Sequence, residues 1–220
     1  MWTLVITFAI LAFFAGSGFY LTFTGSLPSG IYKKTDASDL RHGSIILFCP
    51  PDNKRLALGK KRNYTRESST CAAGTAPLGK IAVGLPGDTV RLDSTGIWVN
   101  RRRVPNSAPP VEDSKGRPLP PKYGTFHLGE GEFYTYSHYV PEKSFDSRFF
   151  GPVENVISVL EPFYVSEPLP ELRMGRSRAD STATAANSAP EAARTTEAAA
   201  QGAATPAPLF SPAPSRREPL

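Results

Sequence analysis

Two residues in this sequence could together cleave a peptide bond, namely Ser26 and Lys80. Ser26 lies in the stretch from Thr24 to Tyr32, where glycine and proline residues favour a turned, extended backbone that cannot continue a helix. A serine on such a backbone can present its hydroxyl to a groove and act as a nucleophile if a base accepts its proton. The same stretch also suits a plain linker, and within it Ser29 is the rival nucleophile.

The base that the serine needs could be a histidine or a lysine. None of the three histidines, His42, His127 and His138, lies in a recognisable serine-hydrolase signature. A lysine can accept the proton only if burial lowers its pKa from about 10.4 to near neutrality. Lys80 is followed by the apolar residues 81–83, so a strand could carry it into apolar surroundings. The alternative is a solvated lysine at a strand end.

The nucleophile stretch follows the only long apolar run of the chain, which extends from Trp2 to Phe23 without a charge. A run of about twenty apolar residues matches the thickness of a bilayer. A cleaved signal peptide would have a lysine or arginine before its apolar stretch, and none precedes this run. We therefore expect residues 1–23 to form an uncleaved transmembrane anchor. Lys33 and Lys34 favour a cytoplasmic domain under the positive-inside rule, but long domains are translocated regardless of a few charges.

Short apolar runs separated by turn residues predict a mainly β domain over residues 24–166. We expect a polar loop over residues 52–70 and an irregular proline-rich segment over 105–121, without an amphipathic helix. The expected strands and β-rich segments cover residues 43–49, 78–92 with a central Pro-Gly-Asp turn, 97–104 as a hairpin, 126–128, 132–136, 144–151 and 156–165.

The chain has only two cysteines, Cys49 and Cys71, and they bracket the polar loop. In an oxidising compartment they could form a disulfide that stabilises the fold by about 3 kcal/mol in the chain-entropy model. The alternative is two unrelated buried thiols, because pairing needs a suitable geometry. Two cysteines and three histidines are too few for a structural zinc site, and we expect neither a metal nor a cofactor.

The composition changes again at residue 167, from where alanine, proline, serine and threonine dominate. Such a segment cannot bury enough apolar surface to offset the entropy of ordering, so residues 167–220 are predicted to be a disordered tail without a catalytic role.

The net charge of +5 suggests attraction to anionic membrane lipid. The run Arg101–Arg103 would suit a nucleic-acid-binding module, but no nucleic-acid fold signature accompanies it, and no nucleic-acid partner is expected.

Three sequence boxes follow one another along the chain. They are Ser26-Leu27-Pro28 behind the apolar run, Lys80 shortly before the turn at residues 84–88, and the segment Ser144–Arg148. In order and approximate separation they resemble the boxes of the type I signal peptidases. The pattern of the first box, from Thr24 to Tyr32, is most similar to that of the TraF-type maturation peptidases of conjugative plasmid transfer. Each box alone is a weak signal, whereas the three together are specific. The resemblance covers about residues 1–165 and excludes the tail.

The resemblance implies a signal-peptidase-like β fold with a Ser/Lys dyad. In this arrangement Ser26 is the nucleophile and neutral Lys80 is its general base. It also implies an oxyanion hole formed by the backbone N–H of Ser26 and the hydroxyl of Thr24.

The third box carries the supporting residues that the resemblance implies. Ser144 matches the serine that orients the lysine amine, and Asp146 and Arg148 match a structural pair near the dyad, although a plain surface ion pair is the alternative. Residues 137–141 depart from the housekeeping enzymes, which have a Gly-Asp-Asn run before this box. That departure weakens a general secretory role more than it weakens the dyad.

The function expected from these features is that of a membrane-anchored serine endopeptidase at the periplasmic face of a bacterial inner membrane. Its substrate would be a pilin precursor or another signal-bearing protein of a conjugative transfer system, and other transfer proteins are candidate partners. One alternative is a general type I signal peptidase of the same mechanism. An alternative of another class is a non-catalytic, basic, membrane-tethered binding module.

Overall fold

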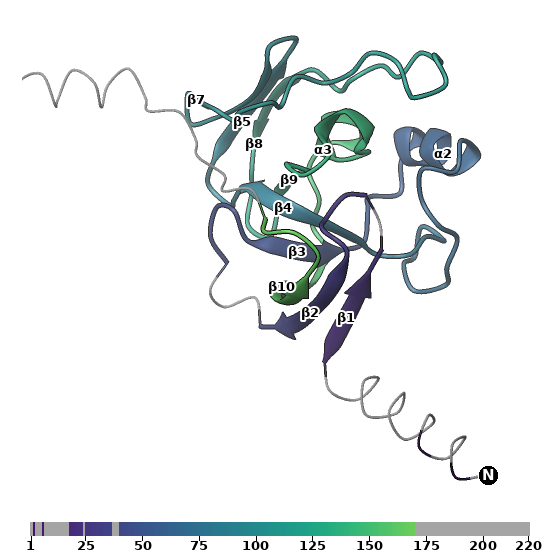
Figure 1. The fold of residues 1–220 in the computed structure, drawn as a ribbon. Coiled ribbons are helices and arrows are strands. Elements are labelled where there is room, and N and C mark those ends of the chain that lie inside the picture. Colours follow the sequence, from purple (N-terminus) through teal and green to yellow (C-terminus); the bar gives the residue numbers. More distant parts are fainter. Residues whose placement is uncertain (1, 3–5, 7–17, 24, 37–39, 170–220) are drawn as a thin grey trace, which may run out of the picture. The chain divides into compact units, whose positions relative to one another are not determined.

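The structure is a computed structural model that describes Trp2, Ile6 and residues 18–23, 25–36 and 40–169 of the chain. In this part of the chain the strands form two antiparallel sheets, and the helices are short (Figure 1). The prediction of a mainly β domain is therefore confirmed.

The larger sheet has six strands in the order β1-β2-β10-β3-β4-β9. β3 and β4 are short apolar runs that are almost entirely buried, as expected for central strands with both faces covered. β10 pairs with β3 through its first half and with β2 through its second half, and the register shifts in both pairings. The bounds are β1 Phe19–Thr22, β2 Gly30–Thr35, β3 Ile45–Phe48, β4 Leu78–Gly84, β9 Tyr134–Tyr136 and β10 Val156–Val165.

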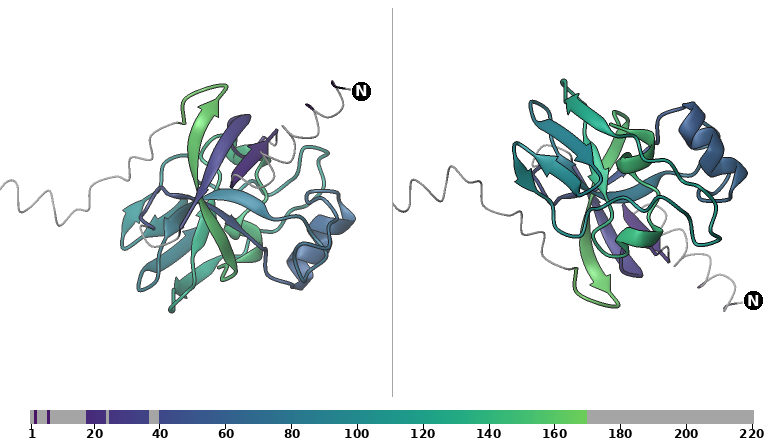
Figure 2. Two further views of the ribbon diagram at one scale, coloured as in Figure 1. Left: turned by 90° about the horizontal axis from the view of Figure 1, so that it is seen from below. Right: turned by 90° about the horizontal axis from the view of Figure 1, so that it is seen from above.

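The smaller sheet has four strands in the order β7-β6-β5-β8. β5 alternates between buried and exposed side chains, so that Val90 and Leu92 point into a core shared with the larger sheet. Both views in Figure 2 show its teal strands grouped apart from β1, β2 and β10. The bounds are β5 Thr89–Asp93, β6 Gly96–Val99, β7 Arg102–Arg103 and β8 Gly124–His127.

A second core is formed by side chains of β3 and β4 with two helices, α2 (Lys54–Lys61) and α3 (Ser147–Phe150). Asn53 is the N-cap of α2, and its side chain accepts hydrogen bonds from the backbone N–H groups of Arg55 and Leu56. The prediction of a loop throughout residues 52–70 was therefore wrong. The assignment of residues 144–151 to the β-rich part was also wrong, because α3 lies within this segment. The 3₁₀ helix η2 (Pro141–Lys143) directly precedes it.

The end of the predicted membrane anchor lies in the sheet. Phe19–Thr22 form β1 and pair with β2. Directly before β1, Gly18 adopts a left-handed backbone (φ 72°), and its carbonyl accepts a hydrogen bond from the N–H of Lys34. No helix among the described residues has both the length and the apolar character needed to span a bilayer. The predicted anchor up to residue 17, except Trp2 and Ile6, lies outside the described residues, as does the predicted tail from residue 170.

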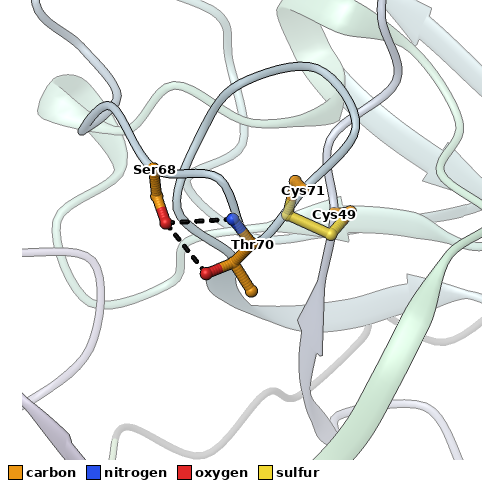
Figure 3. The surroundings of a disulfide bond; sticks show 4 residues. All are labelled: Cys49, Ser68, Thr70 and Cys71. Atoms are coloured by element: carbon orange, nitrogen blue, oxygen red, sulfur yellow. Dashed lines mark hydrogen bonds between the residues drawn. A yellow bond between two sulfur atoms is a disulfide. The ribbon is translucent and has the colours of Figure 1, made fainter.

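Cys49 and Cys71 form a disulfide with a Cα–Cα distance of 5.5 Å (Figure 3). Of the two alternatives that the sequence left open, the structure therefore contains the crosslinked one. Cys49 directly follows β3, and Cys71 lies in the loop before β4, where Ser68 accepts a hydrogen bond from the N–H of Thr70. The crosslink closes the segment that contains α2 and ties it to the two central strands.

Candidate active site

Ser26 lies in the turn between β1 and β2, half-buried and next to two buried residues, Leu27 and Pro28. The hydroxyl of Tyr32 donates a hydrogen bond to the carbonyl of Pro28 at 2.9 Å, which fastens the turn to β2. Gly30 has no room for a side chain, because a Cβ atom there would collide with the backbone of β10. These two contacts hold the part of the turn that follows Ser26 against β2 and β10.

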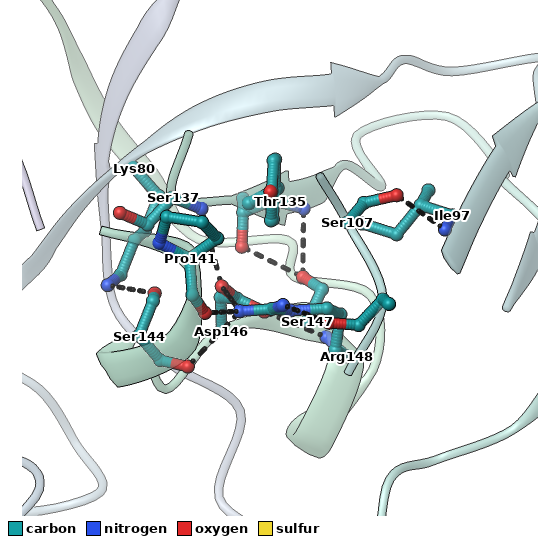
Figure 4. A network of polar contacts seen from close by, with 12 residues as sticks. Lys80, Ile97, Ser107, Thr135, Ser137, Pro141, Ser144, Asp146, Ser147 and Arg148 are labelled. Carbon is teal, nitrogen blue, oxygen red and sulfur yellow. Dashed lines mark hydrogen bonds and ion pairs between the residues drawn. The ribbon is translucent and has the colours of Figure 1, made fainter. Parts of the chain in front are cut away.

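Lys80 lies in β4, opposite Ile46 of β3, and only 2% of the residue is exposed. Its Nζ atom lies 2.5 Å from Oγ of Ser26 and 2.8 Å from Oγ of Ser144. Figure 4 shows the lysine amine pointing toward Ser144. The fold thus brings to the lysine amine two serine side chains that are 54 and 64 positions away in the sequence. A solvated strand-end lysine, the alternative for Lys80, does not describe this side chain.

Burial lowers the pKa of Lys80 from 10.5 to about 8. The nearby carboxylate of Asp146 raises this pKa, and the guanidinium of Arg148 lowers it, so the two charges partly cancel at the amine. An amine with such a pKa is neutral in part of the molecules near pH 7 and can then accept a proton from a hydroxyl within hydrogen-bonding distance.

Asp146 and Arg148 form an ion pair with fully buried side chains. The guanidinium donates to both carboxylate oxygens, from Nε at 2.8 Å and from a terminal nitrogen at 2.9 Å (Figure 4). It also donates to the carbonyls of Ala108, Pro141 and Ser144. Removing one partner of a buried pair leaves an uncompensated charge, which typically costs about 3–5 kcal/mol. The pair therefore fastens the segment that carries Ser144, and it is not a surface ion pair.

Sequence reasoning missed Ser137, which is fully buried beside the same cluster. Its hydroxyl donates a hydrogen bond to the carbonyl of Ser26 at 2.8 Å, and its N–H donates to Asp146 at 3.3 Å. The only sequence signal was its position at the start of the segment that departs from the housekeeping pattern.

The other candidate residues lie elsewhere or outside the described part of the chain. Thr24 is not among the described residues. His42 pairs with Asp88 at 2.7 Å in the turn between β4 and β5, and His127 contacts Thr89 on the smaller sheet. Within the described residues, no three histidine, cysteine or acidic side chains are grouped so that they could hold a metal ion.

The chain is similar to one protein family and to several proteins of plasmid and conjugal transfer. The family model "Signal peptidase, peptidase S26" matches residues 3–159. A plasmid transfer protein TraF of Escherichia coli is 34% identical over 143 residues, which cover 63% of this chain and 78% of that protein. A conjugal transfer protein TraF of Agrobacterium tumefaciens (strain 15955) is 29% identical over 167 residues, covering 74% and 92%.

Solved structures similar to this chain include a bacterial signal peptidase. A signal peptidase I from Enterococcus faecalis V583 has 21% sequence identity and covers 56% of this chain and 97% of its own. The TM-score of this comparison is 0.32.

Proposed function

The chain belongs to the signal peptidase S26 family, which implies serine peptidase activity, and we propose that Ser26 and Lys80 perform that activity as a catalytic dyad. The observation that carries this proposal is the contact between a buried lysine amine and the hydroxyl of a serine on a fixed turn, at 2.5 Å. A nucleophile and a base within hydrogen-bonding distance are the geometric requirement for covalent catalysis by serine.

The proposed reaction begins with attack of Ser26 Oγ on the scissile carbonyl, while neutral Lys80 accepts the hydroxyl proton. The lysine then delivers this proton to the leaving amine, and an acyl-enzyme remains on Ser26. Lys80 next accepts a proton from a water molecule, whose oxygen attacks the ester carbonyl. It then returns that proton to Ser26 Oγ as the acyl–oxygen bond breaks, which restores the serine. Ser144 would orient the amine through its contact at 2.8 Å. The N–H of Ser26 and the hydroxyl of Thr24 would stabilise the oxyanion, in line with the family resemblance.

The rate of cleavage should rise with pH until Lys80 has lost its proton. Because burial places the pKa of Lys80 at about 8, kcat/KM should increase about tenfold per pH unit below pH 8 and level off above it. At pH 7 about one tenth of the enzyme would have a neutral lysine, against less than about one thousandth at an unshifted pKa. The measurement is a pH profile of kcat/KM with a peptide substrate that does not itself titrate. A midpoint near 6.5 would instead indicate a histidine base.

We also propose where the enzyme works and on what. Its relatives are named as plasmid and conjugal transfer proteins, which supports a pilin precursor or another signal-bearing protein of a conjugative system as the substrate. We place the catalytic domain on the periplasmic side of the inner membrane as part of this proposal. Four exposed apolar side chains on and after β1 and at the end of β10 support contact with a membrane surface. They are Leu21, Phe23, Phe163 and Tyr164.

The substrate proposal can be tested by co-expression of the full chain with a pilin precursor of a conjugative transfer system, followed by intact mass of the product. We expect a mass that corresponds to trimming or to cyclisation, and the unprocessed mass with Ser26→Ala. In parallel, the purified enzyme is offered a secretory preprotein. Efficient cleavage of the preprotein with an untouched pilin precursor would support a general signal peptidase instead.

A further inference from the structure

Ser137 occupies a position where three parts of the candidate active site meet. It directly follows β9, and the register pair Ile81↔Tyr136 places it across from Lys80 of β4. Ser137 is 0% exposed, so its hydroxyl has no access to bulk water. That hydroxyl donates to the carbonyl oxygen of Ser26 at 2.8 Å. A buried serine thus contacts the backbone of the proposed nucleophile from the strand next to the proposed base.

The backbone of Ser137 is itself held by the buried ion pair. Its N–H donates to one carboxylate oxygen of Asp146 at 3.3 Å, and Arg148 donates to both oxygens of the same carboxylate. The closeness of Ser137 to Asp146 can be followed in Figure 4. The contacts therefore run without a gap from a buried charge pair, through Ser137, to the carbonyl of Ser26.

We propose that Ser137 is a positioning residue that fixes the peptide carbonyl of Ser26 and thereby keeps the Ser26 hydroxyl next to Lys80 Nζ. This inference rests on the proposed function of Ser26 and Lys80. Ser144 contacts the base at its amine, whereas Ser137 contacts the nucleophile at its backbone, so the two buried serines have separate tasks. The proposal also gives a role to the first residue of the segment that departs from the housekeeping sequence pattern.

The physical reason is the way in which the turn holds Ser26. The side chain and the carbonyl of Ser26 are bound to different strands, the first to β4 and the second to the end of β9. Without the Ser137 hydroxyl, the carbonyl would lose a buried partner, and the turn could rotate toward water to satisfy it. A displacement of about 1 Å of a reacting group can reduce the rate about 100-fold.

The first experiment compares Ser137→Ala with the matched control Ser107→Ala in the full chain. Ser107 is also 0% exposed, and its hydroxyl donates to a backbone carbonyl, that of Val104, at 2.6 Å, but it lies beside the smaller sheet. We expect Ser137→Ala to lower kcat about 10- to 100-fold with KM within about threefold, because binding is kept and alignment is lost. Ser107→Ala should keep kcat within about twofold, since it removes a hydrogen bond remote from the reacting atoms.

Two further readouts separate positioning from a merely structural role. The midpoint of the pH profile should stay the same in Ser137→Ala, because the charges and the burial that set the pKa of Lys80 are unchanged. Ser137→Thr keeps a hydroxyl and should recover most of kcat. A kcat of Ser137→Ala within twofold of wild type, or equal losses in Ser137→Ala and Ser107→Ala, would overturn the proposal. If Ser137→Ala does not fold, Ser137→Cys, with a weak donor of similar volume, takes its place with the same expected loss.

The second experiment detects the contact without using activity. Ser26-Leu27 is the only Ser-Leu dipeptide in the sequence, so labelling with carbonyl-¹³C serine and ¹⁵N leucine isolates the Ser26 carbonyl in a single NMR correlation. Its ¹³C shift should move when the hydrogen bond is lost in Ser137→Ala and should stay in Ser107→Ala. An unmoved shift in Ser137→Ala would contradict the contact. Absence of any cleavage by wild type would instead reject the proposed function, and the NMR result would still decide the contact.

Discussion

Ser26→Ala should abolish peptide-bond cleavage, with a loss of about 10⁴-fold or more in kcat, and should leave the chain folded. Loss of the nucleophile in other serine peptidases has effects of this size, because no neighbouring group can form the acyl-enzyme. Ser26 is half-buried, and alanine removes one oxygen atom without adding volume, so the turn should keep its shape. The measurement is the fraction of cleaved substrate by intact mass, with the thermal unfolding midpoint as a check of folding.

Ser29 provides the matched control for this prediction. It lies three residues away in the same turn and is exposed, and its carbonyl accepts a hydrogen bond from the N–H of Ser166. Ser29→Ala should therefore keep kcat close to that of wild type. Normal cleavage by Ser26→Ala together with loss of cleavage in Ser29→Ala would show that Ser29, and not Ser26, is the nucleophile.

Lys80→Arg should lower kcat about 100- to 10,000-fold, the usual contribution of a general base. The guanidinium keeps its proton at any pH that the protein survives, so the positive charge remains while the base is lost. Lys80→Met removes the amine at similar length and should be equally inactive. Because it also removes the cost of burying an ammonium, its free energy of unfolding at pH 7 should be no lower than that of wild type. Kinetics and urea unfolding of both variants provide the measurements.

The exposed Lys34 serves as the control for this pair of variants. Lys34→Arg should retain wild-type kcat and the same pH profile. Full activity in Lys80→Arg would exclude Lys80 as the proton acceptor. Inactivity of Lys80→Met together with a large drop in its unfolding free energy would mean that the effect comes from the fold.

The chemistry-bearing residues could be predicted from sequence because each lies in a local pattern of its own. Ser26 follows the apolar run, Lys80 opens an apolar stretch of strand, and Ser144 stands in the third box. The close approach of these three side chains could not be derived from sequence. It depends on the pairing of β3 with β4 and on the place of the turn before β2 in the larger sheet. The family resemblance supplied that information, and the distances of 2.5 and 2.8 Å agree with it.

The missed helices have weak apolar periods. α2 buries only Leu56 and Gly59, so its sequence is nearly polar all round, and its main signal was the capping residue Asn53 after two prolines. α3 has four residues, all buried, which is too short to show a helical period. Asp146 is its N-cap and accepts a hydrogen bond from the N–H of Arg148. β1 was assigned to the anchor because apolar composition does not distinguish a strand from the end of a membrane segment.

Ser137 shows a different limit of sequence reasoning. Its hydroxyl reaches the carbonyl of Ser26 across 111 positions of the chain. No residue type signals such a contact, because the acceptor is a backbone atom that every residue carries. Only the tertiary fold places the two groups together.

The Cys49–Cys71 crosslink has a consequence for how much reactivity this fold can tolerate. Lowering the pKa of Lys80 from 10.5 to about 8 costs the native state about 3 kcal/mol, in full below pH 8 and vanishing as the pH rises to 10.5. The crosslink contributes about 3 kcal/mol of opposite sign. The bridged segment leads directly into β4, the strand that carries the lysine. The disulfide thus offsets the cost of burying the Lys80 amine. Without it, the reduced chain would bury the same amine with a free energy of unfolding lower by about 3 kcal/mol.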